Sequence, residues 1–171
     1  MGLFAGTDIG YELERPATRI EILVMLIKLL GENDKALSYS GKHPFSDVPA
    51  WADTYVAFAY NKGYTAGTSV TTFSPNNLAT GDQYATFVLK ALGYDSDSDF
   101  SWDKALAFSE SLKVISAAEF SLLNGTFLRD KMVYLSFCAL SARYKNGSST
   151  LIQGLIGAGI ISQKIVDEAF W

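Results

Sequence analysis

The stretch Thr18–Gly31, TRIEILVMLIKLLG, and its counterpart Thr80–Gly93, TGDQYATFVLKALG, decide the fold of this chain. A shift of 62 residues sets the two in register, with Thr, Lys, Leu and Gly recurring at the same places. Self-similarity at a fixed period is the signature of a repeat architecture. We therefore expect the chain to be built from related units.

Each stretch predicts a long helix with marked ends. A threonine stands three residues before Glu21 and again before Gln83, and this spacing predicts a capping box at the helix start. Gly31 and Gly93 suit the left-handed residue that closes a helix. Because residues 20–30 are apolar nearly all round, the first of these helices is expected to be central.

The chain around these stretches predicts three units, each with a short helix, a Gly-rich loop and a long helix. In the second unit Pro49–Lys62 reads as the short helix, with apolar residues at helical spacing, and Gly63 ends it. Arg129–Ser141 aligns weakly with the second long helix, and Trp102 stands opposite Trp51. The third copy is thus the most divergent.

We predict an all-α fold in a single domain, a pseudo-threefold helical prism with the long helices at its centre. The first unit lacks its short helix, so the C-terminal segment is expected to pack beside residues 2–31 and close the first repeat. The expected boundaries are 2–33 for the back half of repeat 1, 34–44 for a linker, 45–94 for repeat 2, 95–100 for a linker, 101–145 for repeat 3 and 150–168 for the closing segment.

Composition excludes several function classes. The 171 residues hold 14 Lys+Arg and 18 Asp+Glu, a formal charge of -4, so no basic field attracts nucleic acid. A single cysteine, Cys138, and a single histidine, His43, leave no cluster for zinc or iron, and we expect no metal and no cofactor. No apolar run is long enough to insert in a membrane, and the first residues lack the pattern of a secretory leader.

Motifs for catalysis are also missing. Asp95–Asp99 begins like a calcium loop, but Phe100 and Leu106 occupy the places of its Gly and Glu. No nucleophile motif accompanies His43, and the apolar surroundings of Cys138 predict an inert buried thiol. We therefore expect no enzyme.

Several short motifs resemble the S-layer homology domain, with a specific match over residues 2–93. These motifs are FSDV at 45–48, WA at 51–52, AYNKG at 59–63, Gly67, FSP at 73–75 and, in the first unit, TRIE at 18–21. The resemblance implies a noncatalytic module that anchors larger exported proteins to the bacterial cell wall, outside the cell. It also implies that an anionic, pyruvylated wall polysaccharide binds in grooves between the repeats.

Arg19 and Arg129 are the main candidates for contacting such an anion. A cation in the first turn of a helix opposes the helix dipole, so it is misplaced unless it serves an anion. Free N-terminal amides beside a guanidinium would form a carboxylate site. Alternatively, Arg19 forms surface ion pairs with Glu14, Glu21 or Asp47. Gly81 occupies the equivalent place in the second unit, so we expect one or two working grooves at most.

The other candidate carbohydrate contacts have structural alternatives. Trp51, like Trp102, could stack on a sugar but is more typical of a core position. Asp47 could accept sugar hydroxyls or cap the short helix, and capping is favoured. Gly63 and Gly67 could supply positive φ, let a sugar approach the backbone, or do both.

Two further functions remain as alternatives. The degenerate units favour a scaffold that has lost glycan binding and serves as a structural or protein-interaction module. An unrecognised hydrolase is the least favoured, because the titratable residues do not cluster.

Overall fold

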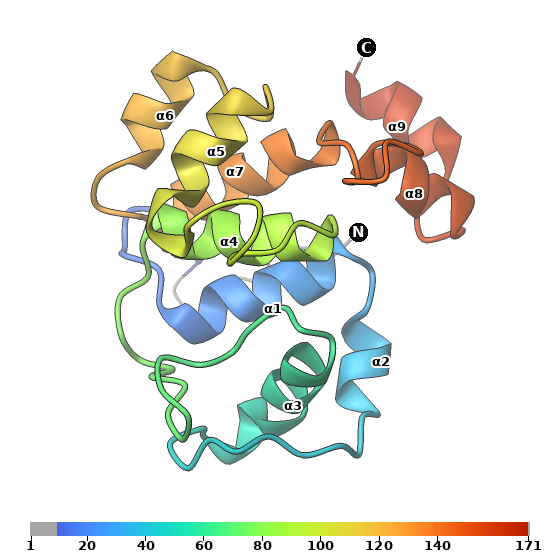
Figure 1. Cartoon of the computed structure of the whole chain (residues 1–171). Coiled ribbons are helices and arrows are strands. Elements are labelled where there is room, and N and C mark those ends of the chain that lie inside the picture. Colours follow the sequence, from blue (N-terminus) through green and yellow to red (C-terminus); the bar gives the residue numbers. More distant parts are fainter. Residues whose placement is uncertain (1–9, 171) are drawn as a thin grey trace.

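The long helices form the centre of the molecule, and the shorter ones lie around them (Figure 1). The computed structural model describes residues 10–170. Its long helices α1, α4 and α7 contact one another pairwise. The described elements are α1 (Arg19–Leu29), α2 (Asn33–Leu37), η1 (Ala50–Ala52), α3 (Asp53–Asn61), α4 (Gly81–Ala91), η2 (Trp102–Lys104), α5 (Ala105–Ser111), α6 (Ala117–Leu123), α7 (Arg129–Leu140), α8 (Leu151–Gly157) and α9 (Gln163–Phe170).

The all-α class is confirmed. Within residues 10–170 the chain has isolated β-bridges but no strand. α1 is central, as predicted, since Ile22, Leu23 and Ile27 have no exposed surface. The predicted capping boxes open both α1 and α4. No helix in this part of the chain is both long and apolar enough to cross a membrane.

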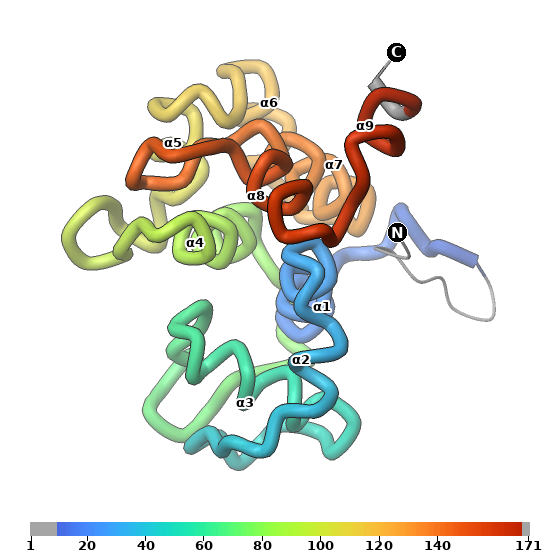
Figure 2. Tube along the Cα trace, turned by 90° about the vertical axis from the view of Figure 1, so that its right-hand side faces the viewer, coloured from blue at the N-terminus to red at the C-terminus, as the bar shows by residue number. Residues whose placement is uncertain are grey.

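The C-terminal segment packs against the end of α1. Gly31 closes this helix with φ +67°, as predicted, and a methyl group there would lie 2.3 Å from Ile160 Cγ2. Leu151, Leu155 and Ile161 are buried in the same core. Figure 2 shows the turn between α8 and α9 close to the end of α1. The role of this segment as the missing front of the first repeat stays a prediction.

Two junctions of the same design tie the units together. The first amide of α1, Arg19 N, donates to Asn77 O at 2.9 Å, and the first amide of α7, Arg129 N, donates to Arg15 O at 3.0 Å. The two acceptors are related by the 62-residue shift. Bridges beside these bonds pair Thr18 with Leu78 and Pro16 with Leu128. The loop of the second unit therefore covers the start of α1, and the loop of the first unit covers the start of α7, while the complete threefold prism stays a prediction.

Helices also occur where the sequence predicted loops. α2 begins at the last residue of the expected repeat 1 and continues into the expected linker 34–44, and α6 lies inside the expected loop of the third unit. The signal for α6 is a third capping box, from Ser116 to Glu119, which the repeat comparison overlooked. The Gly-rich loop expected at 2–7 lies outside the described residues.

Candidate functional site

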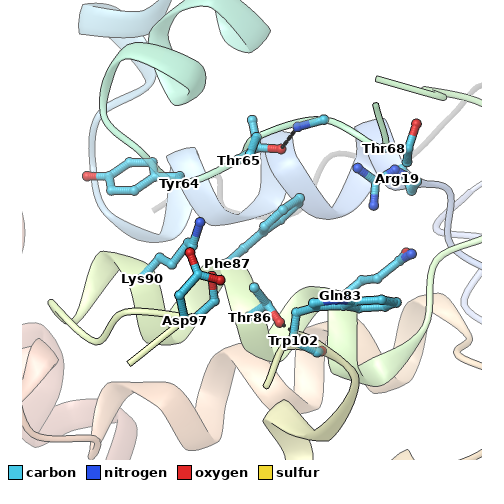
Figure 3. Close-up of a pocket in the computed structure, with 13 residues that line it drawn as sticks. Arg19, Tyr64, Thr65, Thr68, Gln83, Thr86, Phe87, Lys90, Asp97 and Trp102 are labelled. Carbon is cyan, nitrogen blue, oxygen red and sulfur yellow. Dashed lines mark hydrogen bonds between the residues drawn. The ribbon is translucent and has the colours of Figure 1, made fainter. Parts of the chain in front are cut away.

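A groove of about 480 Å³ lies where parts of all three units meet (Figure 3). The first unit contributes Arg19 from the start of α1. The second contributes the loop 64–68 and the outer face of α4, and the third contributes Trp102. The site is therefore built only when the units pack together.

Arg19 is the buried cation of this groove, with 5% of its surface exposed. Its Nε donates to Phe73 O at 3.0 Å, and its Cζ lies 5.1 Å from the Phe73 ring centre and 6.0 Å from that of Phe87. Burial lowers the pKa of Arg19, whereas the charge of Asp47 raises it. The aromatic rings and one carbonyl thus hold the guanidinium in place.

No ion pair neutralises Arg19 among the described residues. The alternative of a pair with Glu14, Glu21 or Asp47 is wrong for this part of the chain, since Glu21 pairs with Arg15 and Arg129 instead. A buried charge without an ion-pair partner is costly, and a bound anion would offset that cost. Arg19 is therefore suited to hold a carboxylate.

The backbone amides at the start of α1 are not available for that anion. Arg19 N donates to Asn77 O, and Ile20 N donates to Pro75 O at 3.0 Å. The expectation of free amides beside the guanidinium is therefore wrong. The cause is the loop of the second unit, which covers this helix end. An anion at the start of α1 would therefore depend on the Arg19 side chain and not on these backbone amides.

Asp47 supports the groove from behind. Its carboxylate accepts hydrogen bonds from Phe73 N at 2.8 Å and Ser74 N at 2.7 Å. It does not cap the short helix, because the N-cap of η1 is Pro49 and makes no side-chain bond. Burial would raise the pKa of Asp47, but these two amides outweigh burial and lower it. Asp47 thus fixes the loop that holds Arg19, and it lies outside the lining of the groove.

The two candidate glycines differ in what surrounds them. Gly63 has φ +75° and Gly67 has φ +80°, so both adopt the left-handed conformation. A Cβ at Gly63 would meet nothing within 4 Å, whereas one at Gly67 would lie 2.4 Å from Phe45 Cε1 and 2.6 Å from Thr72 O. Only Gly67 lines the groove. Gly63 therefore ends the helix without close neighbours, whereas Gly67 lies in closely packed surroundings.

The prediction that both tryptophans belong to the core is wrong. Trp51 is 62% exposed and Trp102 is 60% exposed. Each lies in a 3-10 turn that precedes its helix, so helical spacing from Tyr55 and Phe58 does not extend to Trp51. Trp102 lines the groove and Trp51 does not. The indole of Trp102 is therefore available to a ligand.

Arg129, the third-unit counterpart of Arg19, lies in an ion pair. Its Nη1 is 2.8 Å from Glu21 Oε1, and Arg15 Nη2 is 2.6 Å from the same oxygen. Burial would raise the pKa of Glu21, but hydrogen bonds from Arg15 and Thr18 outweigh it and keep the pKa low. The carboxylate is thus ionised and already occupies Arg129.

Gly81, the second-unit counterpart, lies in a closed space. A Cβ there would lie 2.8 Å from Leu106 Cδ1 and 2.8 Å from the backbone oxygen of Leu123. The third unit therefore fills the place that an arginine side chain would need. The structure brings together Arg19, Gly67 and Trp102, while Arg129, Trp51 and Gly63 lie elsewhere.

Lys90 and Tyr64 line the groove but were not among the predicted candidates. Lys90 recurs in register with Lys28, so repeat comparison carried a signal for it. Tyr64 follows a helix-closing glycine and gave no distinct signal. Its hydroxyl donates to Glu32 Oε2 at 3.0 Å, which orients its ring at the groove.

The candidates for catalysis are held inside the fold. His43 Nδ1 accepts from Phe45 N at 3.1 Å, and its Nε2 lies 3.1 Å from Asp53 Oδ1. Burial raises the pKa of Cys138 to about 11, which disfavours the nucleophilic thiolate. Within residues 10–170 no three metal-ligating side chains gather.

Comparison with known proteins gives one family. The model of the S-layer homology domain matches residues 44–85. The chain is similar to a cell surface protein of Thermoanaerobacter kivui, at 29% identity over 156 residues, which covers 87% of this chain and 20% of that protein. It is also similar to an endoglucanase of Bacillus sp. (strain KSM-635), at 31% identity over 81 residues, which covers 46% of this chain and 9% of that protein. The chain matches a fifth or less of the full length of each of these relatives.

Proposed function

We propose that this chain, whose residues 44–85 match the S-layer homology domain, is a noncatalytic module that anchors a larger protein to the bacterial cell wall. Its ligand is an anionic wall polysaccharide, held in the groove between Arg19, the loop 64–68 and Trp102. The family match and the similarity to a cell surface protein support a place at the cell surface.

Arg19 carries this proposal. Its guanidinium is buried, lines the groove, and has no ion-pair partner among the described residues. Phe73, Phe87 and the more distant charge of Asp47 offset only part of its lost hydration, because none of them is a directly bonded anion. A carboxylate from a ligand would supply the missing charge through the strong, directional bonds of a guanidinium.

The remaining groove suits a sugar. Trp102 is exposed at the rim, and an aromatic face binds the apolar CH groups of a sugar ring. Thr65, Thr68 and Gln83 offer hydroxyl and amide groups nearby. A pyruvate ketal places a carboxylate directly on a sugar ring. A pyruvylated polysaccharide therefore combines both features that the groove would recognise.

We further propose that this groove is the working one. The place of Gly81 is filled by Leu106 and by the Leu123 backbone, and Arg129 is held by Glu21. The module would then bind a single glycan segment. Fusion to a larger exported protein accords with the small share of each relative that the chain covers.

A scaffold without glycan binding is the second candidate function. The filled place at Gly81 and the Arg129–Glu21 pair favour it, because both remove an anion contact that the repeat pattern predicted. Such a module would keep the fold for structural or protein contacts.

Calorimetric titration with purified pyruvylated wall polysaccharide separates these functions. Arg19→Met keeps the length and the apolar contacts of the side chain but removes its charge, and Arg19→Lys keeps the charge without the planar fork. The matched control is Lys164→Met, which removes a cation from an exposed site on α9.

The native protein and Lys164→Met are expected to bind with one ligand segment per chain. Arg19→Met should lose at least tenfold in affinity, since a charge-assisted hydrogen bond contributes about 1.5–3 kcal/mol, and Arg19→Lys should lie between the two. Depyruvylated polysaccharide should bind the native protein no better than it binds Arg19→Met. Absence of binding by a folded native chain would favour the scaffold.

A further inference from the structure

Two asparagines of the chain stand directly before a glycine. Asn124 lies in the turn between α6 and α7, and Asn146 lies in the turn between α7 and α8. Both pairs are exposed. Asparagine is a thermolabile residue, above all before glycine, because a glycine has no side chain to shield its amide nitrogen. The same reactive dipeptide therefore occurs in two different surroundings of one molecule.

The pair at Asn146 is held on both of its reacting sides. The Asn146 Oδ1 atom accepts hydrogen bonds from Ser148 N at 3.0 Å and from Ser148 Oγ at 2.7 Å. The amide of Gly147 donates to Tyr144 O at 2.8 Å. For Gly147 N to reach the carboxamide carbon of Asn146, these hydrogen bonds must break, and each of them stabilises the turn as it stands.

The pair at Asn124 is held on one side only. The amide of Gly125 donates to Leu123 O at 3.1 Å. The backbone angles of Asn124, φ -84° and ψ 65°, are those of an inverse γ-turn, in which the short ring bends the hydrogen bond and weakens it. Within the described part of the chain the Asn124 carboxamide makes no hydrogen bond. Turning the peptide between Asn124 and Gly125 towards the carboxamide therefore costs a single bent bond.

A cation also lies beside the first pair. Lys131 Nζ donates to Thr126 O at 2.8 Å, and a Cβ on Gly125 would lie 3.9 Å from this nitrogen. Attack by an amide nitrogen on a carboxamide removes the amide proton and places negative charge on the carboxamide oxygen, and a nearby cation stabilises both changes. The lysine next to the second pair, Lys145, is instead 2.7 Å from Asp99 Oδ2.

We propose that Asn124 is a site of spontaneous modification in the folded protein, and that the fold protects Asn146. The bond from Gly125 N to Asn124 Cγ forms, the bond from Cγ to Nδ2 breaks, and the glycine amide proton leaves with Nδ2 as ammonia. Water then opens the cyclic imide and leaves aspartate or isoaspartate at position 124. No atom changes its oxidation state, and water is the only co-reactant.

The modified residue would lie in a link between two buried anchors. Leu123 and Phe127 are 0% and 2% exposed. A Cβ on Gly81 would lie 2.8 Å from Leu123 O, and Phe127 O accepts the amide of Ala17 at 3.0 Å. Isoaspartate lengthens the main chain by a methylene, which this closely packed link accommodates poorly. The isoaspartate form should therefore be less stable than the native protein.

The rates at the two asparagines test the inference. The native protein is incubated in mildly alkaline buffer, once folded and once in concentrated urea, where only the local sequence acts. Peptide mapping by mass spectrometry follows each asparagine, and labelling by an isoaspartyl methyltransferase identifies isoaspartate. Lys131→Met removes the cation near Asn124, and Ser148→Ala removes a hydroxyl donor to Asn146. The matched control is Lys164→Met on exposed α9.

In the folded protein Asn124 should react about tenfold or more faster than Asn146, because Asn146 must give up more hydrogen bonds, whereas in urea the two rates should be similar. Lys131→Met should slow the reaction at Asn124 alone, Ser148→Ala should speed it at Asn146 alone, and Lys164→Met should change neither. The separated isoaspartate form should have a lower Tm than the native protein.

Equal rates at the two asparagines of the folded protein, or a faster reaction at Asn146, would overturn the inference. An unchanged rate at Asn124 in Lys131→Met would contradict the role of the cation. No glycan enters this assay, so its result does not depend on the proposed function.

Discussion

Replacing Gly67 and Gly63 by alanine separates two costs that are usually measured together. Both glycines are left-handed, at φ +80° and +75°, and an L-residue in that conformation costs about 1–2 kcal/mol. Only Gly67 also has neighbours within contact of a new methyl group, namely Phe45 and Thr72 O. Gly63→Ala is therefore a matched control that carries the backbone cost alone.

The steric part of the cost at Gly67 is hard to relieve. Thr72 O is fixed because it accepts the amides of Thr68 at 2.8 Å and Ser69 at 3.2 Å, and Phe45 is buried in the core. Overpacking of this kind costs about 1–3 kcal/mol. Gly67→Ala should therefore lose about 2–5 kcal/mol in total, against about 1–2 kcal/mol for Gly63→Ala.

Urea denaturation followed by circular dichroism measures both losses. In thermal melts, the extra cost at Gly67 should lower the Tm by about 2–12 °C more than Gly63→Ala does, because 1 kcal/mol corresponds to about 2–4 °C at this chain length. Equal free energies of unfolding for the two variants would refute the packing described around Gly67.

Three other substitutions probe the supports of the groove and core. Glu21→Gln should reduce the loss of stability in acid. Hydrogen bonds, chiefly from Arg15, hold the pKa of Glu21 below its usual 4.5 despite burial. The Glu21 carboxylate therefore stabilises the fold above pH 4.5, and this stabilisation is lost as the pH falls through the lowered pKa. Thermal melts of the native and Gln proteins should therefore converge towards about pH 3, and parallel curves would contradict this. Tyr84→Phe removes a buried hydroxyl 2.5 Å from Ser136 Oγ and should cost about 1 kcal/mol in urea denaturation; an unchanged midpoint would argue against that bond. Asp47→Ala removes the acceptor of two loop amides and should cost about 1.5–3 kcal/mol, with Asp47→Asn losing less, and equal melting of all three proteins would contradict the assigned role.

The central helices could be predicted from the sequence because their signals are local. Each capping box needs residues three apart, and the helix-closing glycines Gly31 and Gly93 follow at the other end, where both have positive φ. The apolar residues on all sides of α1 also predicted its burial, since such a helix is stable only inside a core. Comparison of the repeats then predicted the positions of α4 and α7 in the sequence.

Features that depend on contacts between units could not be predicted in this way. The amides of α1 are covered by residues 75 and 77, far along the chain, and no local pattern announces such a partner. Trp51 and Trp102 are exposed because each lies in a 3-10 turn, where the helical period fails. The closed place beside Gly81 needed the positions of Leu106 and Leu123, which only the packed structure supplies.

The segment 16–18 has a consequence for how the chain acquires its structure. It pairs with Leu78 on one side and with Leu128 on the other. Its backbone hydrogen bonds are therefore complete only after residue 128 has been synthesised and has reached this segment. Contacts of such long sequence separation slow folding, because their loop-closure entropy must be met first. An emerging chain would leave the side of α1 that faces α7 uncovered until residues 129–140 have been made. Folding in one concerted, slow phase is expected, in contrast to solenoid repeats, in which folding can start at any repeat and spread to its neighbours.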